Sequence, residues 1–164
     1  MTIDYGRETI TVLEPQRQRN SAPVIVPRCC GTGDTVMSPV VRAPGHDYHI
    51  GPGEVHIVLP SRPEVTQQHG YFHAGATSSI ADSAGGYAAF TLFPEGTSVL
   101  TVEFKINLLA PAEGDQLEAV GTVIKPGRTL TICRLEVFGI TSTQRTLVAA
   151  GQQTLIQIES RPER

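Results

Sequence analysis

Residues 67–90 read QQHGYFHAGATSSIADSAGGYAAF, and this segment determines the architecture that we expect for the chain. From Ala74 to Phe90 nearly all side chains are small, no Pro interrupts them and alanine recurs, so the segment is predicted to be one long helix. A helix with small side chains on every side can be wrapped closely, which favours a curved sheet around it. A single acid, Asp82, lies in the middle, and acids in apolar surroundings are costly without partners or a chemical task.

The helix is expected to end near Leu92, because a Phe-Pro-Glu-Gly turn follows. Gly85 and Gly86 lie inside it, where each costs roughly 1 kcal/mol relative to Ala, so another backbone or a ligand is expected to approach closely. Asp82 has no charged neighbours on its helical face and is predicted to be held in a cleft rather than solvated. His73 precedes the helix, where capping or packing and a role near a substrate carbonyl are both open.

The composition limits the classes of function. A chain of 164 residues suggests one domain with a real core, and a net charge of −3 argues against a general nucleic-acid surface. No apolar run reaches the roughly 20 residues of a membrane span, and the N-terminus has no basic segment followed by an apolar one. Three cysteines, two of them adjacent, make no disulfide framework. We therefore expect a cytoplasmic protein.

Residues 1–51 are predicted to form an irregular N-terminal segment, with a short strand at 9–13. A flexible arm, a surface-wrapping segment and a misassigned start, with Met37 as a later one, are all open. Cys29, Cys30, His46 and His49 do not have the spacing of a standard structural zinc site, so no metal is expected.

The rest of the chain alternates between apolar and polar residues with the period of strands. A strand at 55–59 precedes the helix, and four strands follow it, at 100–108, 117–123, 129–138 and 144–158. A turn at Lys125–Arg128 joins the second and third of these four, and the apolar positions slip between Ile132 and Leu135, which predicts a bulge there. The fold class is thus α+β, an antiparallel sheet wrapped around one long central helix over residues 52–158, with a charged tail at 159–164.

Several of these residues match a known family. His73-Ala74-Gly75, then Ile80-Ala81-Asp82-Ser83-Ala84, then Val102–Asn107 followed by Pro111 and Gly114-Asp115, closely resemble the hotdog-fold acyl-CoA thioesterases of the phenylacetate-pathway (PaaI-like) family. The resemblance covers roughly residues 52–158. It implies the hotdog fold, a homodimer whose sheets join edge to edge and which commonly forms a homotetramer, and hydrolysis of an acyl-CoA thioester without a cofactor.

The same resemblance implies roles for individual residues. Asp82 matches the catalytic acid, acting as general base on water or as nucleophile, and Thr101 matches a hydroxyl near that water. Ala74 stands where the family usually has a Gly, and the backbone N–H groups of Ala74 and Gly75 would form the oxyanion hole. Gln67 falls where relatives have an amide that helps to hold the carbonyl or the water.

The proposed chemistry also has a geometric consequence. A helix N-terminus offers free N–H groups and the positive end of the dipole to a developing oxyanion. Ala74 and Asp82 are, however, separated by eight residues, or about 12 Å of helix. One carbonyl cannot readily meet both from a single helix, so an active site shared across a two-fold interface is predicted, with the dimer as the minimal active unit.

Other interpretations remain open beside this one. Lys125, Arg128 and Arg134 would grip the CoA phosphates, or would simply be solvated. Cys133 has no evident His partner, so a cysteine nucleophile is not expected. The alternatives to hydrolysis are a hotdog dehydratase of 3-hydroxyacyl thioesters and a non-catalytic acyl-CoA-binding protein. The sequence does not reveal the acyl group.

Overall fold

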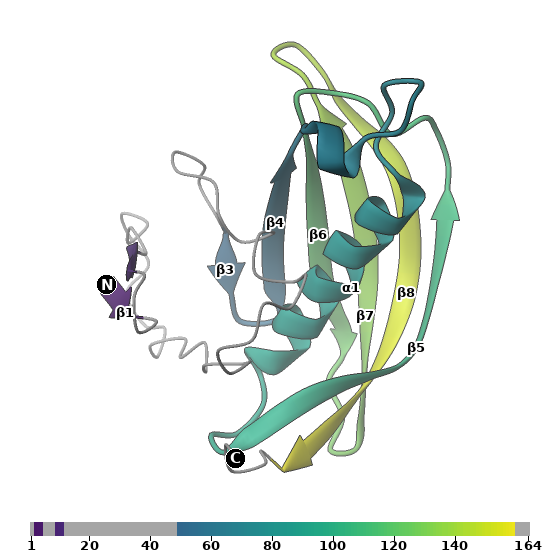
Figure 1. Ribbon diagram of the computed structural model, residues 1–164. Helices are drawn as coiled ribbons and strands as arrows, with labels where there is room; N and C mark the ends of the chain where they lie inside the picture. The colour runs from purple at the N-terminus through teal and green to yellow at the C-terminus, as the bar shows by residue number, and fades with distance from the viewer. Residues whose placement is uncertain (1, 5–8, 12–48, 160–164) are drawn as a thin grey trace.

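A computed structural model describes residues 2–4, 9–11 and 49–159, and it places one long helix against a curved antiparallel sheet (Figure 1). The helix, α1 (Ala74–Phe90), lies along the concave side of the sheet. The predicted α+β hotdog architecture is therefore confirmed. Two short strands near the N-terminus, β1 (Thr2–Asp4) and β2 (Thr9–Thr11), pair with each other in a separate sheet, and β2 falls in the segment predicted as a strand at 9–13.

The main sheet has six strands in the order β3-β4-β6-β7-β8-β5, and all neighbours are antiparallel. Their bounds are β3 (Ile50–Gly51), β4 (Glu54–Pro60), β5 (Thr97–Leu108), β6 (Gln116–Lys125), β7 (Leu130–Ile140) and β8 (Arg145–Glu159). Each predicted strand after residue 52 is present. Since β5 follows the helix but pairs with β8, it forms one edge of the sheet.

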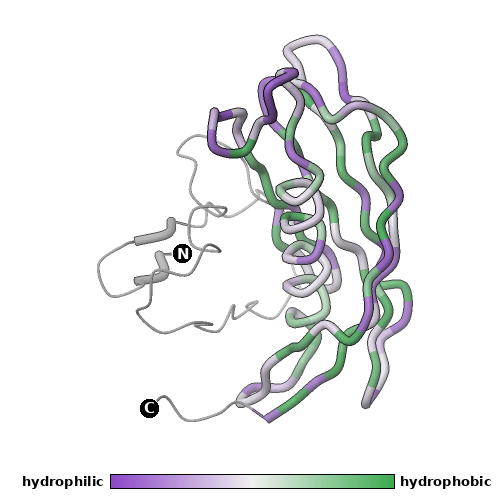
Figure 2. Tube along the Cα trace, turned by 45° about the vertical axis from the view of Figure 1, so that its right-hand side comes forward, coloured by the Kyte–Doolittle hydropathy of each residue, from purple (hydrophilic) through white to green (hydrophobic). Residues whose placement is uncertain are grey.

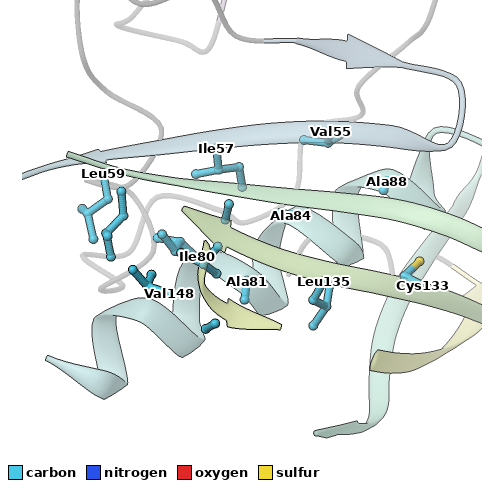
Figure 3. Packing of buried hydrophobic residues seen from close by; sticks show 14 of the residues in the cluster. Val55, Ile57, Leu59, Ile80, Ala81, Ala84, Ala88, Cys133, Leu135 and Val148 are labelled. Atoms are coloured by element: carbon cyan, nitrogen blue, oxygen red, sulfur yellow. The ribbon is translucent and has the colours of Figure 1, made fainter. Parts of the chain in front are cut away.

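The core lies between α1 and the concave face of the sheet. Side chains from α1 point toward those of β4, β7 and β8 (Figure 3). The largest fully buried apolar side chains are Leu59, Ile80, Leu117, Leu135 and Leu155. Along α1 the tube in Figure 2 is mostly pale, which reflects the small residues of intermediate hydropathy that form it. These small residues are what allow the sheet to approach the helix.

The adjacent glycines inside α1, Gly85 and Gly86, differ in their surroundings. A Cβ built on Gly85 would lie 2.0 Å from Oε1 of Gln153, and one on Gly121 of β6 would lie 2.3 Å from the carbonyl carbon of Ala84. The close neighbours of Gly85 are therefore the side chains of Gln153 and Leu135, whereas the predicted approach of another backbone is that of Gly121 against Ala84. Nothing among the described residues lies within 4 Å of a Cβ at Gly86. The helix ends at Phe90, two residues before the predicted end, as is common for helix termini.

The bulge predicted in β7 is wrong. Thr131, Cys133, Leu135 and Val137 are all buried, so β7 alternates without a slip, and Leu130 and Ile132 simply face away from the helix. The registers shift elsewhere, at Thr101/Glu103 in β5, at Val123/Lys125 in β6 and opposite Val137/Phe138 in β8. The error arose because apolar side chains lie on both faces of this strand.

Several predictions for the N-terminal third cannot be compared with the structure. Cys29, Cys30, Met37 and His46 lie outside the described residues. His49 is described, and its ring stacks edge-on against that of His56 with the centroids 5.1 Å apart. None of the described helices is long and apolar enough to cross a membrane.

Candidate active site

Asp82 lies in the middle of α1 and is half-buried. The hydroxyl of Thr101 on β5 donates to its Oδ1 over 2.8 Å, and the side-chain amide of Gln153 on β8 donates to the same oxygen over 2.6 Å. The amide nitrogen of Gln153 also lies 2.9 Å from Oγ1 of Thr101. The predicted pair of Asp82 and Thr101 is thus brought together, within a three-residue cluster that joins a helix to two strands.

The register shift in β5 explains how Thr101 reaches Asp82. Thr101 is opposite Leu155, whereas Glu103 is opposite Thr154, so Val102 is an extra residue. Opposite residues share a face of the sheet, and Leu155 is buried on the helix side. Thr101 therefore faces the helix, as Phe104 does beyond the bulge. An unbroken period of two would put Thr101 and Phe104 on opposite faces of β5. The extra residue, Val102, brings both to the helix side.

Gln153 was not predicted as a site residue. It is fully buried, and it occupies a helix-facing position of β8 between Gly151 and the buried Leu155. A period-of-two reading of β8 would have shown an amide directly before the apolar Leu155 in the helix-facing row, which is the signal that could have identified it. Its contact with Asp82 spans 71 positions of sequence, so no local motif contains the pair.

The N-terminus of α1 presents unused backbone donors. His73 is the N-cap residue, and its carbonyl accepts the first helical bond from the N–H of Thr77 over 3.0 Å. The N–H groups of Ala74 and Gly75 therefore have no partner within the helix, and both residues are exposed. The His73 side chain makes no capping hydrogen bond, so the capping role considered for it is wrong.

Gln67 lies in the turn that leads into the helix. Its N–H donates to the carbonyl of Tyr71 over 2.8 Å, and its carbonyl accepts from the N–H of Gly70 over 2.9 Å. These main-chain bonds fix the turn, while the half-buried side chain makes no hydrogen bond to the described residues. The amide of Gln67 is therefore available to another molecule.

The three basic residues considered for phosphate binding lie elsewhere. Lys125 ends β6, and Arg128 lies in the turn that follows. This turn is at the same end of the molecule as the C-terminus of α1 (Figure 1). Arg134 is exposed on the outer face of β7, and its Nε lies 3.2 Å from Oε2 of Glu136. None of the three adjoins Asp82 within this subunit.

The edge strand carries a row of exposed apolar side chains, which lie on both faces of the strand because of the bulge. The exposed fractions are 54% for Leu100, 57% for Val102, 40% for Phe104 and 57% for Leu108. Since β5 pairs only with β8, its outer edge has no strand partner among the described residues. An unpaired apolar edge is unusual in a soluble domain and invites pairing with another strand.

Two other titratable groups, Cys133 and Glu118, have shifted pKa values. Cys133 is fully buried, and burial raises the pKa of its thiol to about 12, which keeps it protonated and unreactive. Burial opposes ionisation of Glu118, yet hydrogen bonds from His56 and Arg145 hold the pKa of Glu118 below its usual value. Over the described ranges, no group of three or more His, Cys, Asp or Glu side chains could hold a metal ion.

Two hollows in the described part of the chain do not include Asp82. One is lined on the outer face of β5 and β8 by Glu103, Lys105 and Gln152, and the other lies beside Gly114 and Thr141. The cleft predicted around Asp82 is therefore not among them.

Comparisons with known proteins agree on one family. Residues 69–144 match the model of the thioesterase superfamily. A thioesterase family protein from Silicibacter pomeroyi is 42% identical, with a TM-score of 0.66 over 68% of this chain and 82% of that one. A Bacillus halodurans protein crystallised with CoA is 26% identical, with a TM-score of 0.58 over 65% of this chain and 67% of that one.

Two further relatives are more distant or shorter in overlap. The PaaI protein of the Escherichia coli phenylacetic acid degradation operon is 23% identical, with a TM-score of 0.58 over 66% of this chain and 75% of that one, which shows the fold alone. A proposed esterase from Saccharolobus solfataricus is 31% identical over 84 residues, which are 51% of this chain and only 59% of that protein.

Proposed function

The chain belongs to the thioesterase superfamily, the class of thioester hydrolases, and from this premise we propose that it hydrolyses an acyl-CoA thioester to the free acid and CoA. The observation that carries the proposal is the carboxylate of Asp82, held by Thr101 and Gln153 at the sheet edge. CoA as the leaving group is supported by the Bacillus halodurans relative, which was crystallised with CoA.

In the proposed reaction Asp82 is the base or the nucleophile. As a base, it takes a proton from water while the water oxygen bonds to the thioester carbon. The carbonyl oxygen becomes an oxyanion, which the N–H groups of Ala74 and Gly75 stabilise. The C–S bond then breaks, CoA leaves as a thiolate, and the proton held by Asp82 passes to it. As a nucleophile, Asp82 would instead form an anhydride that water opens.

The site is proposed to be shared between two subunits. Asp82 lies about 12 Å along α1 from Ala74, which is too far for both to meet one carbonyl. Thr101, which contacts Asp82, lies on the edge strand with the exposed apolar row. A second copy that joins its own β5 to this edge would cover that row and bring its helix N-terminus toward Asp82. The homodimer is then the minimal active unit, and two dimers could assemble as a tetramer.

Supporting roles follow from the positions of the remaining residues. The free side-chain amide of Gln67 and the exposed His73 stand beside the donors at the helix N-terminus, where they could contact the carbonyl or the water. Lys125 and Arg128 are the better candidates for the CoA phosphates, because Arg134 is already paired with Glu136. In a shared site, Gln67, His73, Lys125 and Arg128 would contact the substrate that lies beside Asp82 of the partner subunit.

The experiment that tests the function replaces Asp82 by Asn, which keeps the shape of the side chain but removes the base. Thiol release from a panel of aliphatic and aromatic acyl-CoA esters is measured, with the exposed Asp115→Asn as the matched control. Loss of a general base typically lowers turnover about 10²–10⁴-fold, whereas the control should retain the wild-type rate.

The panel also separates hydrolysis from its alternatives. If the wild type binds acyl-CoA but releases no thiol from any ester, the protein is a binding module. If Asp82→Asn hydrolyses as fast as the wild type, the role of Asp82 is wrong. The ester with the highest kcat/KM identifies the acyl group that the pocket accepts.

A further inference from the structure

In the described part of the chain, Gln153 is the one buried polar side chain that reaches the carboxylate of Asp82. Its Nε2 donates over 2.6 Å to Oδ1 of Asp82, and the same nitrogen lies 3.2 Å from the main-chain oxygen of Asp82 and 2.9 Å from Oγ1 of Thr101. Gln153 is fully buried, so water does not compete for these contacts. The amide of Gln153 therefore contacts both Asp82, the proposed base or nucleophile, and Thr101, which donates to Asp82.

Both hydrogen bonds to the carboxylate end on the same oxygen. Thr101 and Gln153 donate to Oδ1, whereas Oδ2 receives no hydrogen bond from the described residues. Two donors fix the plane of the carboxylate and leave Oδ2 as the oxygen with free lone pairs. Since Asp82 is only half-buried, that oxygen is the one a water molecule or a thioester could meet.

The other end of the amide is in an unusual state. Oε1 of Gln153 is buried and has no hydrogen-bond partner among the described residues, which is costly for an acceptor. It lies against α1 where Gly85 has no side chain, and a Cβ on Gly85 would stand only 2.0 Å from it. The free-energy cost of the unpaired acceptor must be offset by the hydrogen bonds at the opposite end of the same amide, where the NH₂ group faces Asp82.

The direction of the amide matches the role of Asp82 as a hydrogen-bond acceptor. If the amide were turned over, Oε1 would face the carboxylate oxygen at hydrogen-bond distance, and two acceptors would repel each other. The observed direction therefore lets Oδ1 of Asp82 accept a hydrogen bond from the amide. Over the described ranges, no charged side chain forms an ion pair with Asp82, so these neutral donors are its only partners there.

We propose that Gln153 is a positioning residue, whose side-chain amide orients the Asp82 carboxylate with Oδ2 toward the substrate. The inference rests on the proposed function, because it needs Asp82 to act on water or on the thioester. Gln153 does not touch the substrate itself. It acts through Asp82, and Gly85 supplies the space that its amide oxygen requires.

A purely structural role is the alternative, since Gln153 also ties β8 to α1 and to β5. The two roles differ in what a variant loses. A structural residue affects stability and every activity alike. A positioning residue affects kcat more than KM, and its removal has no further effect once the group it positions is gone.

The test replaces Gln153 by Met, which has a similar length but no donor, and uses Gln152→Met on the exposed outer face as the matched control. Steady-state kinetics are measured by thiol release from hexanoyl-CoA and phenylacetyl-CoA. We expect kcat of Gln153→Met to fall about 10- to 100-fold, the usual effect of losing a hydrogen bond to a charged group, with KM within about twofold. Gln152→Met should match the wild type.

The same substitution is then made in an Asp82→Ala background. We expect Asp82→Ala and Asp82→Ala/Gln153→Met to have the same residual rate, because nothing remains to be positioned. If Gln153→Met does not fold, Gln153→Glu decides, since it keeps the shape of the side chain. Two carboxyl groups this close share a proton, so Asp82 would no longer be a free base and kcat should fall as well.

Two results would overturn the inference. In the first, Gln153→Met and Gln153→Glu have the same kcat as Gln152→Met. In the second, Gln153→Met and Gln153→Glu lower kcat by the same factor in the wild-type background and in the Asp82→Ala background. Failure of the proposed function gives a different result, in which Asp82→Ala alone retains the wild-type kcat. If Asp82→Ala is inactive but Gln153→Met has the wild-type kcat, the proposed role of Gln153 is wrong and the proposed function stands.

Discussion

The hydroxyl of Thr101 donates to Oδ1 of Asp82 over 2.8 Å, which joins the edge strand of the sheet to the middle of the central helix. This contact places the candidate base at the one long edge of the sheet that has no neighbouring strand among the described residues. The position matters because a site at an edge can be completed by another subunit, whereas a site under the middle of the sheet cannot.

Removing the Thr101 hydroxyl should weaken the candidate base without unfolding the protein. We expect Thr101→Val to lower kcat about tenfold or more, because a hydrogen bond to a charged group is lost while the shape is kept. Thr154→Val, on the outer face of β8, is the matched control and should retain the wild-type kcat. Equal kcat values for the two variants in a thiol-release assay would show that the Thr101 hydroxyl has no part in turnover.

The two adjacent helical glycines should respond oppositely to alanine. Gly85→Ala places a methyl group against Gln153 and Leu135, so the free energy of unfolding should fall by about 1–3 kcal/mol. Gly86→Ala meets no described atom, so unfolding should cost up to about 1 kcal/mol more than in the wild type. Urea denaturation of both variants measures the difference. A Gly85→Ala variant as stable as Gly86→Ala would contradict the packing described here.

A charge on the edge strand should separate the subunits. Val102→Lys puts an ammonium group in the exposed apolar row of β5, and we expect a monomer with little thiol release but an unchanged circular dichroism spectrum. Ile124→Lys is the matched control, because Ile124 is equally exposed at 56% but lies on β6. Light scattering coupled to size exclusion reports the mass. An active monomeric Val102→Lys variant would mean that one subunit holds a complete site.

Glu118 should make stability depend on pH. Its Oε1 lies 2.9 Å from Nδ1 of His56 and its Oε2 accepts from Nε of Arg145 over 2.9 Å, contacts that lower its pKa in the folded state. Because the folded pKa is lowered, the stabilisation is present above the usual value of 4.5 and is lost as the pH falls through the lowered pKa. We expect Glu118→Gln to melt below the wild type at pH 7, with the gap closing in acid. A gap that is independent of pH would contradict this account.

The sequence was sufficient where the structural signal is local. The run of small residues from Ala74 to Phe90 predicted the helix, and the alternation in β5, β6 and β8 predicted the strands. The bulge at Val102 was not predictable, because all five apolar residues from Leu100 to Leu108 keep an unbroken period of two along the chain. Only the pairing with β8 reveals the extra residue that turns Thr101 toward the helix.

The candidate site was predictable only in part for the same reason. Asp82 stood out as a lone acid among small side chains, and the family resemblance indicated Thr101. Gln153 is 71 positions away from Asp82 and becomes its neighbour only when β8 pairs with β5. A contact between distant segments leaves no mark in the spacing of either segment, so the buried amide could be recognised only in the folded chain.

Replacing Ala74 by Pro removes one backbone donor of the proposed oxyanion hole with little strain. Proline is favoured at the first position of a helix, where its missing N–H has no helical partner. His73, with φ −61° and ψ 137°, already has the extended backbone that a residue before proline prefers. If Ala74→Pro alone remains active, Gly75→Pro is added to remove the second donor. Ala74→Pro should fold but lose about 10²–10³-fold in kcat.

Subunit mixing tests the shared active site most directly. Inactive Asp82→Asn subunits and inactive Ala74→Pro subunits (with Gly75→Pro if needed) are dissociated, mixed in equal amounts and reassociated, and thiol release is measured. If the base and the oxyanion hole come from different subunits, each mixed dimer has one intact site, so activity should recover to about a quarter of the wild type. If both come from one chain, every site keeps a defect. A mixture that exchanges subunits but stays as inactive as its two components would contradict the account.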